Sequence, residues 1–197
     1  MTPERRNKLL QVLHKRQEGL CVVLENIHDP HNMFAVMRTC DAVGIQDVYI
    51  INTKIPSKKK IGMHSSSGAV KWLTKHIYQD IAECMTEVKK KYETIAATHF
   101  ATSSKSLYEL NFLKSTAFVF GNEHKGLSDE ILEYTNTNFI IPQVGIIESL
   151  NISVACAVSI YEAYRQRESA GMYAERNLNN EQYETLKKSW GFTRLDD

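Results

Sequence analysis

Short apolar runs alternate along the chain with segments whose apolar positions recur at helical spacing. The runs at 20–24, 47–51, 94–98, 117–120 and 139–141 are apolar at nearly every position. Strands of this kind are buried on both faces, which is typical of a parallel sheet covered by helices. The pattern therefore predicts an α/β fold, in which a parallel sheet carries helices on both faces.

Helices are predicted between these runs. They are expected at 30–43, 77–91, 149–167 and 180–190, with a short helix from residue 128 and another that starts at residue 3. Pro3 suits the first turn of a helix, where its missing N–H has no partner in any case. Gly44 is a typical residue just after a helix end. Residues 52–68 are rich in Lys, Ser and Gly and are expected to form a loop.

The length favours one central domain. A chain of 197 residues is typical of a single domain with short additions, so we expect a domain at 19–168, a basic helix at 1–18 and a helical extension at 169–197. The uncharged stretch at 149–161 is shorter than a membrane span. Charges follow Met1 where a secretory signal would have an apolar segment. We therefore expect a cytoplasmic protein without a membrane partner.

The cysteines and histidines do not suggest a metal site. The four cysteines lie far apart among apolar neighbours, at Cys21, Cys40, Cys84 and Cys156. Because no C-x-x-C pair occurs, we expect buried free thiols and neither a disulfide framework nor a structural zinc site. His28 and His31 could form half of a metal site, but no second pair stands at a suitable spacing. We therefore expect no metal.

Basic residues gather in a few places, although the net charge is only +1. Arg5, Lys8, Lys15 and Arg16 fall on one side of the predicted N-terminal helix, beside an apolar stripe. Further basic clusters lie at 54–60, 89–91 and 165–167. A protein that is neutral overall but basic in places can bind a polyanion on one face. The alternative is that each cluster is only a solvated surface.

Familiar nucleotide-binding motifs are missing after the predicted strands. No G-x-G occurs in the chain, which excludes the dinucleotide fingerprint. Residues 121–126 have the glycine spacing of a phosphate-binding loop, but Leu127 stands where a Lys should follow. A serine nucleophile elbow is also missing.

Polar residues next to strand ends remain as candidates, because ligands of a parallel sheet bind there. Asn32 and Arg38 lie in the helix after the first strand, and Arg38 interrupts an apolar run. A buried or half-buried guanidinium needs a partner; the alternative is an exposed ion pair with Asp41. Asn122 and Glu123 stand between two glycines that can let the backbone approach a ligand. The alternative there is an ordinary strand-to-helix turn.

A third polar group opens the long helix at 149–167. Helix capping would explain Ser149, but it does not explain Asn151 and Ser153 inside a segment that otherwise reads Val-Ala-Cys-Ala-Val. The helix is apolar on nearly every side, as expected for a helix covered by its own sheet and by a second subunit. We therefore expect a homodimer.

Together, the three groups resemble the three motifs of the SPOUT class of RNA ribose methyltransferases. They occur here as Asn32…Arg38, as Gly121-Asn-Glu123…Gly126, and as Ile141-Pro…Gly145…Ser149-Leu-Asn151-x-Ser153. The segments 24–26, 38–44 and 165–173 are similar to the TrmH type, the tRNA guanosine-2′-O-methyltransferases. The resemblance extends over nearly the whole chain, and the three motifs together are far more specific than any one alone.

The resemblance implies a fold that spacing cannot reveal. The C-terminal part of the sheet would be tied in a deep trefoil knot, an exception to the rule of un-knotted connections. The knotted loops would bind S-adenosylmethionine around Thr98, Gly121, Ile141 and Leu150, and the long helix would build an obligate homodimer.

The resemblance also implies roles in the reaction. Glu123, Ser149 and Asn151 would line the reaction centre, Asn32 would order it, and Arg38 would be the catalytic residue. The family favours Arg38 as the base that takes the proton of the ribose 2′-hydroxyl. Because the pKa of an arginine side chain is far above neutrality, the residue could instead polarise the hydroxyl or bind a neighbouring phosphate.

Three residues depart from the usual pattern of the family. Glu148 stands where Gln is usual, and His124 and Lys125 replace a Lys-aromatic pair. These departures concern the affinity for the substrate and the choice of nucleotide more than the type of reaction.

The reaction implied is transfer of a methyl group to the ribose 2′-hydroxyl of tRNA, at the D-loop guanosine of tRNA position 18. The tRNA backbone would be bound by Arg5, Lys8, Arg16, Arg165 and Arg167. One alternative is a ribosomal-RNA ribose methyltransferase, although such enzymes commonly carry an N-terminal RNA-binding domain and only 19 residues precede the first predicted strand. The other alternative is a non-catalytic dimeric RNA-binding module with the same fold.

Overall fold

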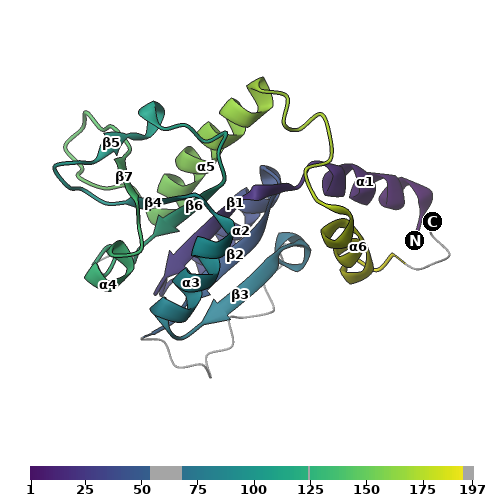
Figure 1. Cartoon of the computed structure of the whole chain (residues 1–197), viewed down its shortest axis with the longest axis horizontal. Helices are drawn as coiled ribbons and strands as arrows, with labels where there is room; N and C mark the ends of the chain where they lie inside the picture. Colours follow the sequence, from purple (N-terminus) through teal and green to yellow (C-terminus); the bar gives the residue numbers. More distant parts are fainter. Residues whose placement is uncertain (54–67, 124, 193–197) are drawn as a thin grey trace.

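A parallel sheet forms the centre of the protein. The computed structural model describes residues 1–53, 68–123 and 125–192, which form a seven-stranded sheet in the order β3-β2-β1-β6-β4-β7-β5 (Figure 1). Every neighbouring pair of strands is parallel. The strands are β1 (Gln17–Glu25), β2 (Ile45–Ile51), β3 (Thr74–Tyr78), β4 (Thr94–Thr98), β5 (Lys105–Ser106), β6 (Thr116–Phe120) and β7 (Thr137–Ile140).

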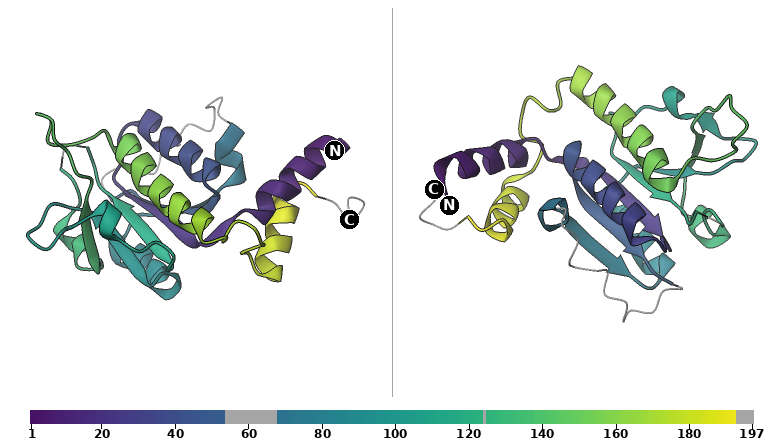
Figure 2. Two further views of the ribbon diagram at one scale, coloured as in Figure 1. Left: turned by 90° about the horizontal axis from the view of Figure 1, so that it is seen from above. Right: turned by 180° about the vertical axis from the view of Figure 1, so that it is seen from behind.

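Helices cover both faces of this sheet, so the predicted α/β fold is confirmed. Figure 2 shows α2 and α5 on one face and α3 and α4 on the other. The helices are α1 (Pro3–His14), α2 (Pro30–Ala42), α3 (Ile81–Lys91), α4 (Asp129–Leu132), α5 (Ile152–Ser169) and α6 (Asn180–Ser189), with 3₁₀ turns at Gly68–Trp72 and Leu107–Glu109.

The side chains of β1 show why the central strands are apolar throughout. Leu20, Val22 and Leu24 belong to the core under α2 and α5, whereas Cys21 and Val23 belong to the core under α3 and α4. Successive residues of a strand point to opposite faces, and both faces are covered here. All four cysteine side chains are buried, as predicted.

The helix predicted at 77–91 begins four residues later, because its first residues belong to a strand. Asp80 is the N-cap of α3, and its side chain accepts a hydrogen bond from the backbone N–H of Glu83 at 2.7 Å. Ile77 lies in β3, an edge strand in which exposed and half-buried residues alternate. The prediction missed this strand because an edge strand lacks the fully apolar run of the central strands.

Helix α2 ends as predicted, with Gly44 in a left-handed conformation (φ +84°) just after the cap residue Val43. A Cβ atom at Gly44 would lie 2.5 Å from the carbonyl oxygen of Lys15. Glycine is therefore required here both by the backbone conformation and by the close approach of the chain.

Helices α1 and α6 form a separate pair at one end of the molecule (Figure 1). Leu9 and Leu13 of α1 pack with Leu186 and Trp190 in a small apolar cluster of their own. The Trp190 ring also meets Trp72 edge-on, with ring centroids 5.2 Å apart. Among the described residues, no helix is long and apolar enough to cross a membrane.

Candidate active site

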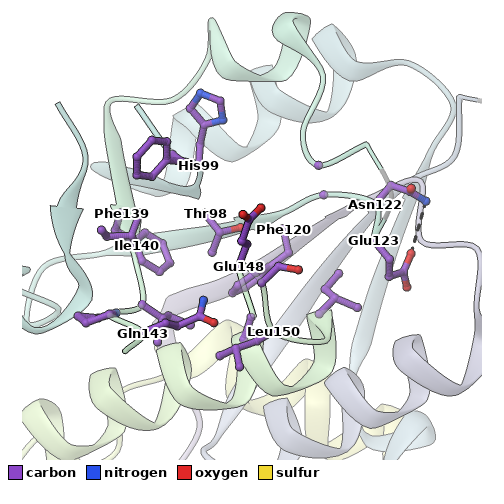
Figure 3. Close-up of a pocket in the computed structure, with 18 residues that line it drawn as sticks. Thr98, His99, Phe120, Asn122, Glu123, Phe139, Ile140, Gln143, Glu148 and Leu150 are labelled. Atoms are coloured by element: carbon purple, nitrogen blue, oxygen red, sulfur yellow. Dashed lines mark hydrogen bonds between the residues drawn. The ribbon is translucent and has the colours of Figure 1, made fainter. Parts of the chain in front are cut away.

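A cavity of about 730 Å³ lies at the carboxyl ends of β4, β6 and β7 (Figure 3). This is the edge where ligands of open parallel sheets bind. It is lined by residues 98–100 after β4, 120–123 and 126 after β6, 139–143 at the end of β7, and 148–150, 152 and 155 at the start of α5.

A tight turn after β6 forms one wall of the cavity. The backbone groups of Asn122 and Gly126 exchange two hydrogen bonds, of 3.0 and 2.8 Å. A Cβ atom at Gly121 would lie 2.2 Å from the carbonyl carbon of Gly126, so no side chain fits at Gly121. The segment is a strand-to-helix turn, as the alternative interpretation held, and it also lines the cavity.

One hydrogen-bonded chain joins the three sequence motifs. The Asn32 side-chain amide donates to Glu123 Oε1 at 2.7 Å, and the Asn151 amide donates to Asn32 Oδ1 at 3.1 Å. Asn32 thus bridges the turn after β6 and the start of α5, although 91 residues separate it from Glu123 along the chain. Each amide in this chain has its orientation fixed by its neighbours.

The structure explains Asn151 and Ser153, which the predicted helix boundary did not. Asn151 is the N-cap of α5, and its Oδ1 accepts hydrogen bonds from the backbone N–H and the hydroxyl of Ser153 at 2.8 and 2.6 Å. The helix begins at Ile152 and not at Ser149, which belongs to the preceding loop. The cap leaves the Asn151 amide nitrogen free to donate to Asn32.

The residues expected to bind the methyl donor come together. Thr98, Gly121, Ile141 and Leu150 all line the cavity, although they follow three different strands. Glu123 and Ser149 line the same cavity. Asn32 and Asn151 reach it through the hydrogen-bonded chain, so eight of the expected residues form one site.

The cavity combines apolar surface with negative charge. Phe100, Ile141 and Leu150 provide apolar surface, while Glu123 and Glu148 bring carboxylates. None of the lining residues that the structure describes is a Lys or an Arg. A ligand with a flat apolar part and a positive charge fits this surface.

Arg38 lies outside the cavity lining. Its side chain is exposed on α2, six residues beyond Asn32 or about 9 Å along the helix axis. It makes no ion pair with the residues that the structure describes. The expectation of a buried or half-buried guanidinium is therefore wrong, and so is the alternative pair with Asp41, which contacts Arg16 instead.

Arg16 was expected to bind RNA, but the structure contradicts this expectation. Its side chain is fully buried, and its guanidinium donates to Asp41 Oδ1 at 2.6 Å and to the Ile45 carbonyl at 3.1 Å. Burial lowers the pKa of Arg16, and Asp41 opposes that shift. Since α1 ends at His14, Arg16 lies beyond the helix and does not share the face of Arg5 and Lys8.

Arg167 is likewise buried, and this contradicts the expectation that it binds the tRNA backbone. Its guanidinium donates to the carbonyl groups of Phe112, Gly19 and Lys114 at 2.8–2.9 Å and to Gln17 Oε1 at 3.2 Å. Burial lowers its pKa to about 10, so the group still carries its charge at neutral pH. It ties the end of α5 to the beginning of β1.

The other expected RNA contacts are accessible. Arg5 and Lys8 are exposed on α1, and Arg165 is exposed on α5. Arg165 pairs with Glu162 through two 2.8 Å hydrogen bonds, which lower the pKa of Glu162. The basic cluster at 54–60 and His124 lie outside the described residues, and Lys125 is exposed next to the turn after β6.

No metal-binding arrangement is found in the part of the chain that the structure describes. No group of three or more His, Cys, Asp or Glu side chains is placed there to hold an ion. His28 and His31 thus gain no further ligand from the described residues.

Comparisons with known proteins agree with this site. A model of the SpoU rRNA Methylase family matches residues 19–161. A Thermus thermophilus protein named tRNA (guanosine(18)-2′-O)-methyltransferase is 37% identical over 191 residues, which are 96% of each chain. A protein of the same name from Escherichia coli is 33% identical over 177 residues, covering 90% of this chain and 76% of the relative.

A solved structure is similar over nearly the same length. The crystal structure of the A. aeolicus TrmH/SpoU tRNA modifying enzyme superposes with a TM-score of 0.85 and 37% sequence identity, and the match covers 94% of both chains. The matched regions include all three polar motifs that meet at the cavity.

Proposed function

This chain belongs to the SpoU rRNA Methylase family, and we propose that it transfers a methyl group from S-adenosylmethionine to the ribose 2′-hydroxyl of the guanosine at tRNA position 18. The resemblance found in the sequence motifs is confirmed by the family match. The hydrogen-bonded chain from Asn151 through Asn32 to Glu123 carries the proposal, because it joins the three motifs beside one cavity. The relatives named for this reaction align over nearly the whole chain.

The cavity suits the proposed methyl donor. S-adenosylmethionine supplies a methyl group bound to a positively charged sulfur, and its adenine ring is flat and largely apolar. Phe100, Ile141 and Leu150 offer apolar surface for such a ring, and Glu123 and Glu148 offer negative charge for the cationic groups. In the reaction, the 2′-oxygen bonds to the methyl carbon, the carbon–sulfur bond breaks, and the hydroxyl loses its proton.

The residues divide into positioning and reacting groups. We assign Glu123, Ser149 and Asn151 to the reaction centre, with Asn32 holding Glu123 and Asn151 in place. Arg38 is exposed on α2 outside the cavity and has no ion pair with a described residue, so its guanidinium is available to the RNA. Arg38 would polarise the 2′-hydroxyl or bind an adjacent phosphate. The family resemblance favours a third role for Arg38, as the base that takes the hydroxyl proton.

The family membership supports three further proposals. We propose that the C-terminal part of the sheet is knotted, and that the chain divides into a basic helix at 1–18, a methyltransferase domain at 19–168 and an extension at 169–197. We also propose that the enzyme works in the cytoplasm, since the relatives that it resembles are named for the modification of tRNA.

A homodimer through α5 is supported by an exposed apolar stripe. Val154 and Tyr161 are 46% and 49% exposed, and Val158 lies between them at helical spacing, so the three share one face. We expect a dimer by light scattering at micromolar concentration. Val154→Asp should produce a folded monomer, because Val154 lies outside the monomer core, whereas Glu168→Ala near the end of α5 should remain dimeric. A monomeric unmodified protein, or a dimeric Val154→Asp protein, would contradict this interface.

The tRNA backbone is proposed to bind along α1 and at the exposed end of α5. Lys8→Gln should weaken binding to all tRNAs about equally and reduce the slope of log K against log[salt] by ~1, because a phosphate contact carries no base identity. Filter binding over a salt series measures both quantities. Lys91→Gln at the C-terminal end of α3 is the control, since it removes the same exposed charge from a helix outside the proposed RNA-binding surface. An unchanged slope for Lys8→Gln would remove α1 from the RNA-binding surface.

One assay tests the function itself. Purified protein is incubated with S-adenosylmethionine and either tRNA or ribosomal RNA, and the 2′-O-methyl position is mapped by nucleoside mass spectrometry. Methylation at position 18 of tRNA is expected, and activity should persist in a chelator. Methylation of ribosomal RNA alone would establish the second candidate, which the rRNA in the family description favours. RNA binding without any methylation would indicate a non-catalytic module.

A further inference from the structure

Two carboxylates line the cavity, and Glu148 is the one outside the hydrogen-bonded chain from Asn151 through Asn32 to Glu123. Glu123 accepts hydrogen bonds from Asn32 at 2.7 Å and from Asn122 at 3.4 Å. Glu148 accepts none from the residues that the structure describes, and Figure 3 shows it among the side chains that line the cavity. Among the described residues of the lining, His99 is the remaining titratable group, and no Lys or Arg is there to neutralise the two acids.

We propose that Glu148 is a specificity residue that makes the cavity prefer a sulfonium methyl donor over its thioether product. This inference rests on the proposed function. The donor and the product have the same adenosine and amino-acid parts, and they differ by one methyl group and one positive charge on sulfur. The apolar surface of Phe100, Ile141 and Leu150 would contact the shared parts of both molecules alike, so the charge on sulfur is the difference that a carboxylate can recognise.

The expected preference is modest. Glu148 is exposed, so water and salt screen its interaction with a positive charge in the cavity. For a screened pair of a carboxylate and a sulfonium, we expect the donor to bind about three- to tenfold more tightly than the product. A preference of this size matters for an enzyme that must release its product before it can bind the next donor, because it reduces inhibition by the product.

Binding measurements on the full chain test the inference without relying on activity. Titration calorimetry would compare S-adenosylmethionine, S-adenosylhomocysteine and sinefungin, in which an ammonium-bearing carbon replaces the sulfonium. Glu148→Gln should weaken binding of both cationic ligands about three- to tenfold and leave binding of S-adenosylhomocysteine within about twofold. Glu148→Asp should keep most of the preference, because it retains the charge.

Glu168→Gln provides a matched control, since it removes the same charge from the exposed end of α5 without touching the cavity lining. If the ratio of the Kd for S-adenosylhomocysteine to the Kd for S-adenosylmethionine were the same in Glu148→Gln as in the unmodified protein, the inference would be overturned. Equal weakening of all three ligands would also overturn it, because Glu148 would then only support the loop. If the unmodified protein bound neither the donor nor the product, the proposed function itself would fail and the inference with it.

Discussion

Replacing Arg38 by alanine is expected to lower the rate of methyl transfer about 10²–10⁴-fold, the range for loss of a group that assists proton transfer. Binding of S-adenosylmethionine should change less than about twofold, because Arg38 lies on α2 outside the cavity lining. Single-turnover methylation of tRNA gives the rate, and titration calorimetry gives the donor affinity. The two measurements separate the transfer step from donor binding.

Two further variants show what Arg38 contributes. Arg38→Lys keeps the charge but loses the planar fork of donors, so a partial recovery of the rate would favour electrostatic assistance. Glu123→Ala should reduce both the rate and the donor affinity, because Glu123 lines the cavity and also binds Asn32. If Arg38→Ala weakened donor binding as severely as it slowed transfer, Arg38 would be a structural residue.

The central strands could be predicted from the sequence because both of their faces are buried. Strand β4 coincides with the apolar run at 94–98, and β6 extends its run by a single residue. Strand β3 could not be predicted in this way, since it lies at the edge of the sheet and carries Lys75 and His76. Its polar residues are compatible with one exposed side, and the local pattern there also fits a helix.

The candidate site could be predicted as a set of residues but not as a geometry. Three motifs far apart in the sequence supplied Asn32, Glu123 and Asn151, and the fold brings them into one hydrogen-bonded chain. The capping role of Asn151 depends on where α5 begins, and sequence patterns locate helix ends only to within a few residues. That boundary decides which atoms of Asn151 are available to Asn32.

The burial of two arginines could not be predicted from the sequence, for a different reason. Arg16 and Arg167 occur in basic clusters, which the sequence alone associates with solvent or with RNA. Their partners in the structure are mainly backbone carbonyl groups, such as those of Ile45 and Phe112. Every residue has such a carbonyl, so no sequence pattern marks the few that a distant guanidinium will reach.

Arg167 and Arg165 form a natural comparison, because they stand two residues apart on α5 with opposite environments. Arg167 is 1% exposed and donates to four acceptors in two segments of the chain, at residues 17–19 and 112–114. Arg165 is exposed to solvent, and its one ion pair with a described residue is to Glu162 on its own helix. The first contact connects distant parts of the fold, whereas the second is local.

Arg167→Ala is therefore expected to destabilise the protein by about 3–5 kcal/mol, because it leaves buried carbonyl acceptors without donors and opens a cavity. For a chain of this length, that loss lowers Tm by about 10 °C. Thermal unfolding at one protein concentration measures it. Arg165→Ala should leave Tm close to that of the unmodified protein but weaken tRNA binding and reduce its salt slope by ~1. If Arg167→Ala kept its Tm and lost only tRNA affinity, the buried contacts would not stabilise the fold and the RNA-binding role expected from the sequence would be restored.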